Sequence, residues 1–323
     1  MNPRVLVVGN SVMGLNLTCS RLPSNGETAS EEQYFYSPAG KGLNTAVALS
    51  RLGGDCVFCT RVGRDANGRQ LLSFCKNSGI DIRFVVSRPE DRTALSVSVF
   101  ENGDVRPRCL EYPSNCREFA PVDLENALTC APDAMILQLG LSRDAVIAAA
   151  RNAARRGVPV FADATDCPPE FPLEKLPKLF TFVVNAEAAQ RLTGIAPSGV
   201  QSCLRICMAL EHRMKAVYYI IKLGHRGVFL YDGTYQKLLS AYEVEVSDLA
   251  AAGDTFMAAM TVSFIRTVAR DAPDMERSCV YANLAAALAV SRPGAAKSVP
   301  TSEEVAEFVT VNAIPFTLED DEK

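Results

Sequence analysis

The feature that most constrains the fold is a regular alternation of short apolar runs with longer amphipathic stretches. The apolar runs occupy residues 4–8, 135–139, 158–161, 182–184 and 217–222. Helical patterns lie between them at 143–156, 187–192 and 200–213. Strands that are apolar on both faces are typical of parallel sheets covered by helices. We therefore predict a doubly wound α/β fold with a mostly parallel sheet and helices on both faces.

A second pattern differs from the first. Residues 94–100 alternate strictly between small polar and apolar side chains, and the hairpin signal Asn102-Gly103 precedes a return strand at 105–112. Alternation with period two predicts an antiparallel sheet with one wetted face. We expect one domain spanning residues 1–323, with a small β element inserted at about 10–40 and 90–115.

Composition excludes several classes of protein. The 37 acidic and 33 basic side chains give a net charge of −4, which does not favour nucleic-acid binding by a basic face. Only two histidines are present, so most histidine-rich metal sites are excluded. The longest uncharged apolar stretch, residues 279–290, is far shorter than the roughly 20 residues that span a bilayer. We expect a soluble protein without a membrane partner.

The chain contains eleven cysteines at irregular spacing. Cys56 and Cys59 form a C-x-x-C pair, but no second pair or histidine lies near it in the sequence. Alternation there is typical of a strand with buried thiols. Reduced structural thiols indicate a reducing compartment, so we expect a cytoplasmic location.

The segment Asp248–Phe256 has the sharpest chemical signal. Ala251, Ala252 and Gly253 come at the start of a long alanine-rich helix, so their backbone N–H groups can approach a ligand closely. Unpaired N–H groups and the helix dipole make such an end an anion site. Asp254 in the first turn could take a proton from a hydroxyl while the amides hold the transferring charge. The alternative is that Asp254 is an ordinary N-terminal acid that favours the dipole.

Several motifs in order resemble the ribokinase-like (PfkB) carbohydrate kinase family. Asp248–Phe256 is similar to the family's signature, and Ala39-Gly-Lys-Gly-Leu-Asn-Thr-Ala46 is similar to its N-terminal motif. Arg61–Gly68 fits its Val-Gly-x-Asp-x-x-Gly stretch. The remaining matches follow at 192–194, 223–227, 285–290 and 294–300, so the resemblance covers nearly the whole chain.

This resemblance implies a doubly wound core with a small β-sheet lid, and transfer of the ATP γ-phosphate to a sugar hydroxyl with Mg²⁺. It implies that Asp254 is the general base and that the amides of Ala251, Ala252 and Gly253 form an anion hole. The substrate-binding residues would be Gly40, Lys41 and Asn44. The nucleotide-binding residues would be Asn185, Lys222, Gly224, Gly227 and Asn283. A monovalent cation such as K⁺ would be held, largely by backbone carbonyls, at Asp248, Ala250, Arg292, Gly294 and Ser298. Relatives often pair their lids, which implies a homodimer.

The sequence departs from the family at the expected sugar contacts. Val12 and Gly14 stand where the family has an Asn-x-Asp pair, and Gly140 stands where it has a glutamate. Each lost carboxylate hydrogen bond is worth about 1.5–3 kcal/mol. We therefore expect a wider, less negative substrate site at Gly14 and Gly140, and a substrate other than ribose. A nucleoside or a phosphorylated sugar is the alternative, with Arg92, Arg106 and Arg108 of the lid available for an anionic group.

A further departure concerns catalysis. The family has an Asn-x-x-Glu motif that helps to organise Mg²⁺ and phosphate, and here Asn185 is followed at the fourth position by Ala188. Loss of such a supporting group typically reduces activity by about 10- to 100-fold. The alternative from a different class is therefore a catalytically weak regulatory protein that binds a sugar or a nucleotide.

Overall fold

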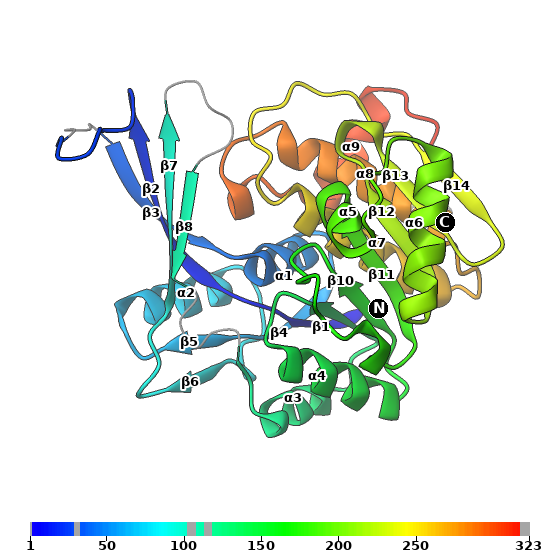
Figure 1. Cartoon of the computed structure of the whole chain (residues 1–323), viewed down its shortest axis with the longest axis horizontal. Helices are drawn as coiled ribbons and strands as arrows, with labels where there is room; N and C mark the ends of the chain where they lie inside the picture. Colours follow the sequence, from blue (N-terminus) through cyan, green and yellow to red (C-terminus); the bar gives the residue numbers. More distant parts are fainter. Residues whose placement is uncertain (1, 29–32, 102–107, 113–117, 317–323) are drawn as a thin grey trace.

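The computed structural model describes residues 2–28, 33–101, 108–112 and 118–316, and its centre is an eight-stranded sheet (Figure 1). The strand order is β14-β13-β12-β11-β10-β9-β1-β4. Six strands are parallel: β4 (Asp55–Cys59), β1 (Arg4–Val8), β9 (Ala134–Gln138), β10 (Val160–Asp163), β11 (Leu179–Asn185) and β12 (Ala216–Lys222). The other two, β13 (Val228–Tyr231) and β14 (Gln236–Leu239), add an antiparallel edge.

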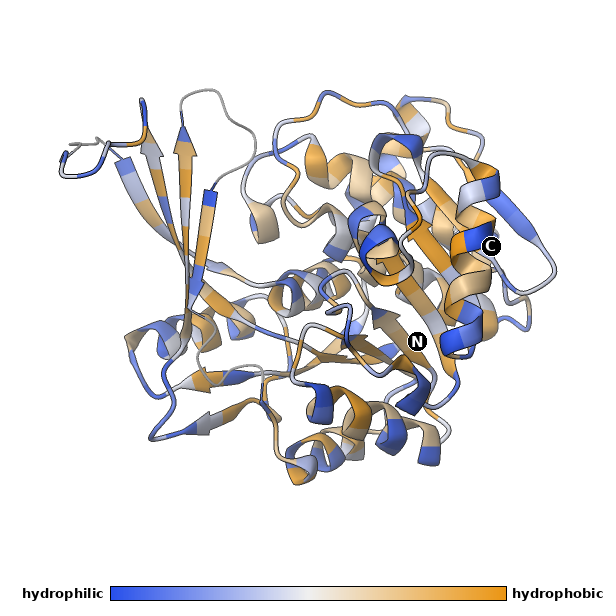
Figure 2. Ribbon diagram, viewed as in Figure 1, coloured by the Kyte–Doolittle hydropathy of each residue, from blue (hydrophilic) through white to orange (hydrophobic). Residues whose placement is uncertain are grey.

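Helices cover both faces of this sheet, because alternate strand residues belong to two separate cores. Val7 packs into one buried cluster and Val8 into the other. The first cluster includes residues of α1 (Lys41–Arg51), α2 (Ala66–Asn77), α7 (Ala252–Val268), α8 (Met275–Val290) and α9 (Ser302–Val311). The second includes residues of α3 (Pro121–Ala127), α4 (Arg143–Arg155), α5 (Ala186–Thr193) and α6 (Val200–Arg213). The orange strands in Figure 2 lie between these layers, and the predicted doubly wound α/β class is confirmed.

A separate four-stranded sheet, called the small sheet below, stands beside the core (Figure 1). Its order is β3 (Gln33–Ala39), β2 (Val12–Cys19), β7 (Ala94–Glu101) and β8 (Arg108–Tyr112). The expected antiparallel pairing holds for β7 with β8, but β2 and β7 are parallel. That part of the prediction is wrong because β2 and β7 leave the core in the same direction. The predicted Asn102-Gly103 turn and Arg106 lie outside the described residues.

The two faces of the small sheet differ in chemistry. Register places Ser37, Gly14, Ser96 and Glu111 side by side on one face. The next residue of each strand points to the opposite face, and these side chains are apolar: Leu15, Tyr36, Val97 and Leu110. Tyr36 and Leu110 are more than half exposed. The small sheet therefore has one polar face and one apolar face that is open to solvent.

Shorter elements complete the fold. The strand that contains Cys56 and Cys59, β4, is followed by a separate short strand, β5 (Arg61–Gly63), which pairs with β6 (Val86–Arg88). Single 3-10 turns lie at η1 (Leu128–Cys130), η2 (Leu173–Lys175), η3 (Gly224–Arg226) and η4 (Ala295–Lys297). Within the residues described, no helix is both long and apolar enough to cross a membrane.

The paired cysteines have a structural explanation. Cys56 packs into the core on one face of β4 and Cys59 into the core on the other face, so their thiols point apart. Burial raises the pKa of Cys59 to about 12, which keeps its thiol protonated and unreactive. This C-x-x-C pair therefore packs the sheet and does not form a metal site.

Candidate active site

Polar residues end several of the parallel strands at one edge of the large sheet. Gln138 ends β9 and Asp163 ends β10 beside it in register. Asn185 and Lys222 end β11 and β12 in the same way, and Asn10 follows β1 closely. Ligands of open α/β sheets bind outside the carboxyl ends of the strands. This edge is therefore the candidate site.

The start of α7 faces this edge and has the geometry of an anion site. The first hydrogen bond of the helix runs from Thr255 N–H to the Ala251 carbonyl, at 2.8 Å. The N–H groups of Ala252, Gly253 and Asp254 precede it, so the helix itself offers them no acceptor. Ala251 has a φ of 61°, a left-handed conformation that usually favours glycine. The small residues predicted for this turn are thus brought together around Asp254.

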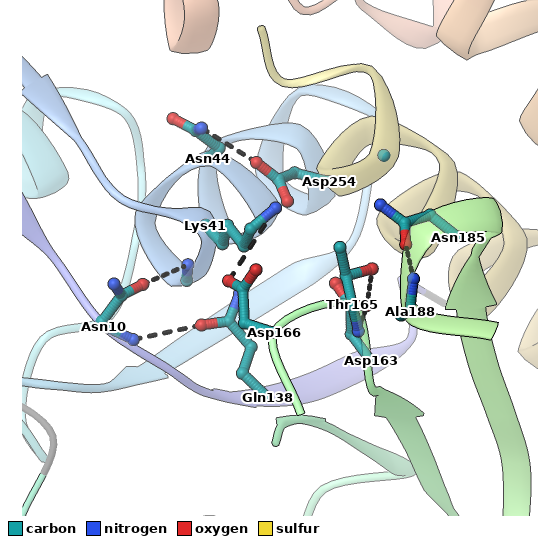
Figure 3. Close-up of polar contacts among 12 residues, drawn as sticks. Asn10, Lys41, Asn44, Gln138, Asp163, Thr165, Asp166, Asn185, Ala188 and Asp254 are labelled. Atoms are coloured by element: carbon teal, nitrogen blue, oxygen red, sulfur yellow. Dashed lines mark hydrogen bonds and ion pairs between the residues drawn. The ribbon is translucent and has the colours of Figure 1, made fainter. Parts of the chain in front are cut away.

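Asp254 is a desolvated carboxylate held in place by α1. Its residue is only 4% exposed, and Asn44 Nδ2 donates a hydrogen bond of 2.9 Å to its Oδ2 (Figure 3). Burial raises the pKa of Asp254 above the ordinary aspartate value, although the charge of Lys41 and the bond from Asn44 oppose this shift. A raised pKa brings a carboxylate closer to the basicity that proton abstraction requires.

Lys41 is one of the cations of this site. It begins α1 directly after Gly40, whose φ of 107° turns the chain into the helix. Burial lowers the pKa of Lys41, but the surrounding charges of Asp254, Asp166 and Asp163 outweigh burial and raise it above the ordinary lysine value. Lys41 therefore stays charged, with its Nζ 3.9 Å from Asp166 Oδ2.

A small cavity opens in front of these groups. Its lining consists of Asn10, Lys41, Gln138, Gly140, Leu141, Asp163 and Asp166. Two buried polar atoms at the site, Gln138 Nε2 and Asn44 Oδ1, have no hydrogen-bond partner among the described residues. Buried polar groups are normally satisfied, so these atoms indicate a polar ligand.

Gly140 and Gly14 differ in where the structure places them. Gly140 lines the cavity, whereas Gly14 lies in β2 of the small sheet, paired with Ser37 and Ser96. The cavity contains carboxylates at positions other than Gly14 and Gly140. Asp163 and Asp166 both line the cavity, where Asp163 lies 3.7 Å from Lys222 and Asp166 lies 3.9 Å from Lys41.

The predicted nucleotide residues split into two groups. Lys222 Nζ lies 3.7 Å from Asp163 Oδ1 and 3.5 Å from the Gly253 carbonyl, next to the start of α7. Asn185 caps α5 by accepting a hydrogen bond of 2.7 Å from Ala188 N–H (Figure 3). Because this hydrogen bond uses the backbone of residue 188, Asn185 keeps its position although Ala188 replaces the glutamate of the family.

The other three predicted nucleotide residues have structural roles in addition to any nucleotide contact. Asn283 Nδ2 donates to the Ser240 carbonyl at 3.1 Å and holds the loop after β14. Gly227 has a φ of 92°, and a Cβ at this position would overlap the Leu239 carbonyl. Gly224 has a φ of 63° and opens the turn η3.

The predicted cation residues lie on two loops that one carboxylate joins. Asp248 Oδ1 accepts from Ala250 N–H at 2.8 Å, and Asp248 Oδ2 accepts from Gly294 N–H at 3.1 Å. Arg292 points elsewhere, toward Glu304, and the Ser298 hydroxyl bonds within its own turn. Carbonyl and carboxylate oxygens are the donors that a hard cation prefers, so the loops of Asp248 and Gly294 fit such an ion.

Divalent metal would have to be held differently. No group of three or more His, Cys, Asp or Glu side chains that could hold a metal ion occurs in the part of the chain that the structure describes. Mg²⁺ in phosphoryl-transfer sites is usually bound through one or two carboxylates, substrate phosphates and waters. The buried carboxylate Asp163 is in a position to take part in such an arrangement.

Sequence reasoning missed four residues of this site: Asn10, Gln138, Asp163 and Asp166. A signal for three of them was present, because Asn10, Gln138 and Asp163 each follow or end a buried apolar strand at its carboxyl end. Asp166 had no such signal. Its place beside Lys41 depends on how the loop after β10 folds back over β9.

Fold and site together define an α/β phosphotransferase, in which a buried carboxylate adjoins an anion-binding helix end. The chain belongs to the pfkB family of carbohydrate kinases, since that family's profile matches residues 2–302. It is thus an enzyme that transfers a phosphoryl group to an alcohol acceptor.

Individual relatives cover nearly the whole chain. The ribokinase of Schizosaccharomyces pombe is 30% identical over an alignment of 318 residues that covers 93% of this chain and 96% of that protein. A structure of Arabidopsis thaliana ribokinase complexed with ribose and ATP has a TM-score of 0.84, with 24% identity and coverage of 96% and 99% of the two chains. A candidate ribokinase II from E. coli in complex with ATP and Mg²⁺ has a TM-score of 0.76, with 21% identity and the same coverage. The ribokinase-like fold is confirmed.

Proposed function

We propose that this protein transfers the γ-phosphate of ATP to a hydroxyl group of a small sugar. The observation that carries the proposal is the buried Asp254, with its raised pKa, in the first turn of α7. Asp254 would take the proton of the attacking hydroxyl. The amides of Ala251, Ala252 and Gly253 would hold the negative charge that develops on the phosphoryl group.

Two residues of α1 would position the acceptor sugar. Asn44 uses its Nδ2 to fix Asp254, and its buried Oδ1 is left to accept a hydrogen bond from a sugar hydroxyl. Lys41 would donate to sugar oxygens and hold the ionised form of Asp254, together with the backbone of Gly40. Proximity and orientation of this kind account for much of the rate in phosphoryl transfer.

The nucleotide would lie on the other side of the α7 start. Lys222 is next to Gly253, where a point charge can contact phosphate oxygens. Asn185, Gly224, Gly227 and Asn283 would form the rest of this site. Asp163, a buried carboxylate beside Lys222, would help to hold the Mg²⁺ of MgATP, which would neutralise phosphate charge.

A potassium ion would stabilise the same helix start from the loop that precedes Ala251. We propose the loops of Asp248, Ala250, Arg292, Gly294 and Ser298 as its site, with backbone carbonyls as the main donors. The Asp248 carboxylate already ties the two loops together through Ala250 and Gly294. An ion bound there would stabilise the turn that leads into Ala251.

The nature of the acceptor is the finer part of the proposal. The case against ribose depended on lost negative charge, and Asp163 and Asp166 now supply carboxylates in the cavity. A sugar hydroxyl can donate to the half-exposed Asp166, whereas the phosphate or carboxylate of an anionic sugar would meet it as a like charge, so we favour a neutral sugar. We still predict that ribose is a poor substrate. This prediction rests on the missing carboxylate at Gly14 and on a carboxylate at Asp166 in place of one at Gly140.

A substrate panel tests both parts. Purified protein is supplied with ATP, Mg²⁺ and K⁺, and ADP release is measured with ribose, 2-deoxyribose, hexoses, nucleosides, sugar phosphates and sugar acids. We expect turnover of at least one neutral sugar, and a Michaelis constant for ribose above the submillimolar range. Turnover of nucleosides or sugar phosphates alone would favour the alternative acceptors. Absence of turnover, with retained binding of a sugar, would favour a regulatory protein.

We also propose that the chain is one kinase domain whose small sheet acts as a lid, and that two lids pair in a homodimer. The apolar face with Tyr36 and Leu110 is open to solvent, and small isolated sheets need a partner. Light scattering at micromolar concentration should give twice the 34.9 kDa of one chain. Leu110→Glu should shift the protein toward the monomer, while Met208→Glu on the outside of α6 should not.

A further inference from the structure

Gly140 has no room for a side chain, because Asp166 occupies the space. Gly140 follows the end of β9, and a Cβ built on it would lie 2.9 Å from the Cβ of Asp166. Carbon atoms of two side chains do not approach so closely without displacement. Asp166 belongs to the loop after β10, the neighbouring strand in the sheet. A carboxylate from one loop thus stands where a side chain from the adjacent loop would otherwise project.

The Asp166 carboxylate is directed at the cavity and at Lys41. Asp166 Oδ2 lies 3.9 Å from Lys41 Nζ, and Figure 3 shows the two side chains facing each other above Gln138. About half of the Asp166 side chain, 54%, is exposed to solvent, so a ligand can reach it. Asp163, the other carboxylate of the cavity, is buried and its Oδ1 already accepts bonds from Thr165.

An independent observation supports the binding of a polar ligand in this part of the cavity. Gln138 is only 5% exposed, and its Oε1 accepts a hydrogen bond from Asn10 N–H at 3.2 Å. Its Nε2 is buried and has no partner among the described residues, although the residue lines the cavity. A hydroxyl oxygen placed between Gln138 and Lys41 would satisfy this amide, and its hydrogen would point at Asp166.

We propose that Asp166 is a substrate-binding residue that determines which sugar this kinase accepts. It would accept a hydrogen bond from a sugar hydroxyl that Gln138 and Lys41 bind from the other side. The proposal rests on the proposed function, because it assigns one contact within the sugar site. A hydroxyl is the only group of a neutral sugar that can both donate to Asp166 and accept from Gln138. A phosphate or carboxylate at that position would meet Asp166 as a like charge.

Steady-state kinetics with the best neutral sugar of the panel test this role. Asp166→Ala should raise the Michaelis constant for the sugar by about 10- to 100-fold, the effect of losing one charged hydrogen bond. The Michaelis constant for ATP should stay within about twofold, because Asp166 is assigned to the sugar and not to the nucleotide. Asp166→Asn should have a smaller effect, since an amide oxygen still accepts. Glu170→Ala, an exposed change in the same loop, is the matched control.

An exchange of positions separates a substrate contact from a merely structural role. Gly140→Glu alone should impair sugar binding, because its Cβ collides with Asp166. Combined with Asp166→Gly, the same change returns a carboxylate to the cavity and removes the collision. The double variant should therefore bind sugar better than either single variant. A structural role for Asp166 predicts only relief of the collision, with sugar binding no better than that of Asp166→Gly alone.

The outcomes also separate this proposal from the function it rests on. If the wild-type protein phosphorylates a sugar but Asp166→Ala leaves the Michaelis constant of every accepted sugar unchanged, the assignment of Asp166 is wrong and the kinase function stands. A parallel rise in the Michaelis constants for sugar and ATP would also overturn it. If the wild-type protein phosphorylates no sugar, both proposals fall.

Discussion

Asp254→Asn is expected to reduce kcat by about 10²- to 10⁴-fold, the usual contribution of a general base. Asparagine has the same shape as aspartate, and its side-chain oxygen can still accept the 2.9 Å hydrogen bond from Asn44. The sugar should therefore bind almost normally while the proton of its hydroxyl has no acceptor. ADP release measured at saturating sugar and ATP checks this. A control at an exposed acid, Asp144→Asn at the start of α4, should leave kcat unchanged.

The same carboxylate predicts how activity depends on pH. Only ionised Asp254 can accept a proton, and burial raises its pKa. The acidic limb of kcat/KM should consequently lie above the pH range of an ordinary aspartate. Lys41→Met removes a charge that lowers this pKa, so the limb should move to still higher pH. An unchanged acidic limb in the Lys41 variant, or a retained rate in the Asp254 variant, would contradict the role of Asp254.

The stability of Asp254→Asn provides a check that its loss of rate is not a loss of folding. For a carboxyl group whose pKa is raised in the folded protein, the favourable contribution to stability is present below the unfolded pKa. That contribution is lost as the pH rises through the folded pKa. At neutral pH the charged Asp254 therefore costs stability. The variant should unfold at the same or a higher urea concentration than the wild-type protein.

Arg61→Met is expected to lower the free energy of unfolding by about 3–5 kcal/mol, a large share of the stability of a typical domain. Arg61 forms a bidentate pair with Asp91, with Nε to Oδ2 at 2.6 Å and Nη2 to Oδ1 at 2.5 Å. Their side chains are 6% and 1% exposed, so the change leaves a charge in the interior. Arg61 also donates to the Glu118 carbonyl at 2.9 Å. Urea denaturation followed by circular dichroism measures the loss.

A double variant distinguishes the buried charge from the lost packing. Arg61→Met combined with Asp91→Leu removes both charges, and apolar replacements of a buried pair are often close to neutral. The double variant should regain most of the stability that the single variant loses. A single variant within about 1 kcal/mol of wild type would show that Asp91 has another compensating partner. The pair joins β5 to the segment that enters β7, so its loss should also loosen the small sheet.

Much of the fold could be predicted because it depends on local patterns. The apolar runs that became β1, β9, β10, β11 and β12 are continuous, and only a sheet covered on both faces buries such strands. The helix α7 was predictable from the small residues before Asp254 and the long apolar stretch after it. The strand β14 was missed because it is an exposed edge strand with a mixed polar and apolar sequence. The strand β13 is a buried apolar run of four residues, a signal that sequence reasoning did not use.

The sequence alone determined the α/β class, the small sheet and the place of Asp254 in the first turn of a helix, because these follow from periodicity and from residues adjacent in the chain. Only the tertiary structure decided the charge of the cavity. Gly140 and Asp166 come from loops after neighbouring strands, and Lys41 comes from a third element. No local pattern connects them, because neighbouring parallel strands are joined by long crossover connections. Residues that lie side by side in the sheet are therefore far apart in the sequence. For this reason the sequence showed only that Gly140 has no carboxylate, whereas the folded protein places the carboxylate of Asp166 beside it.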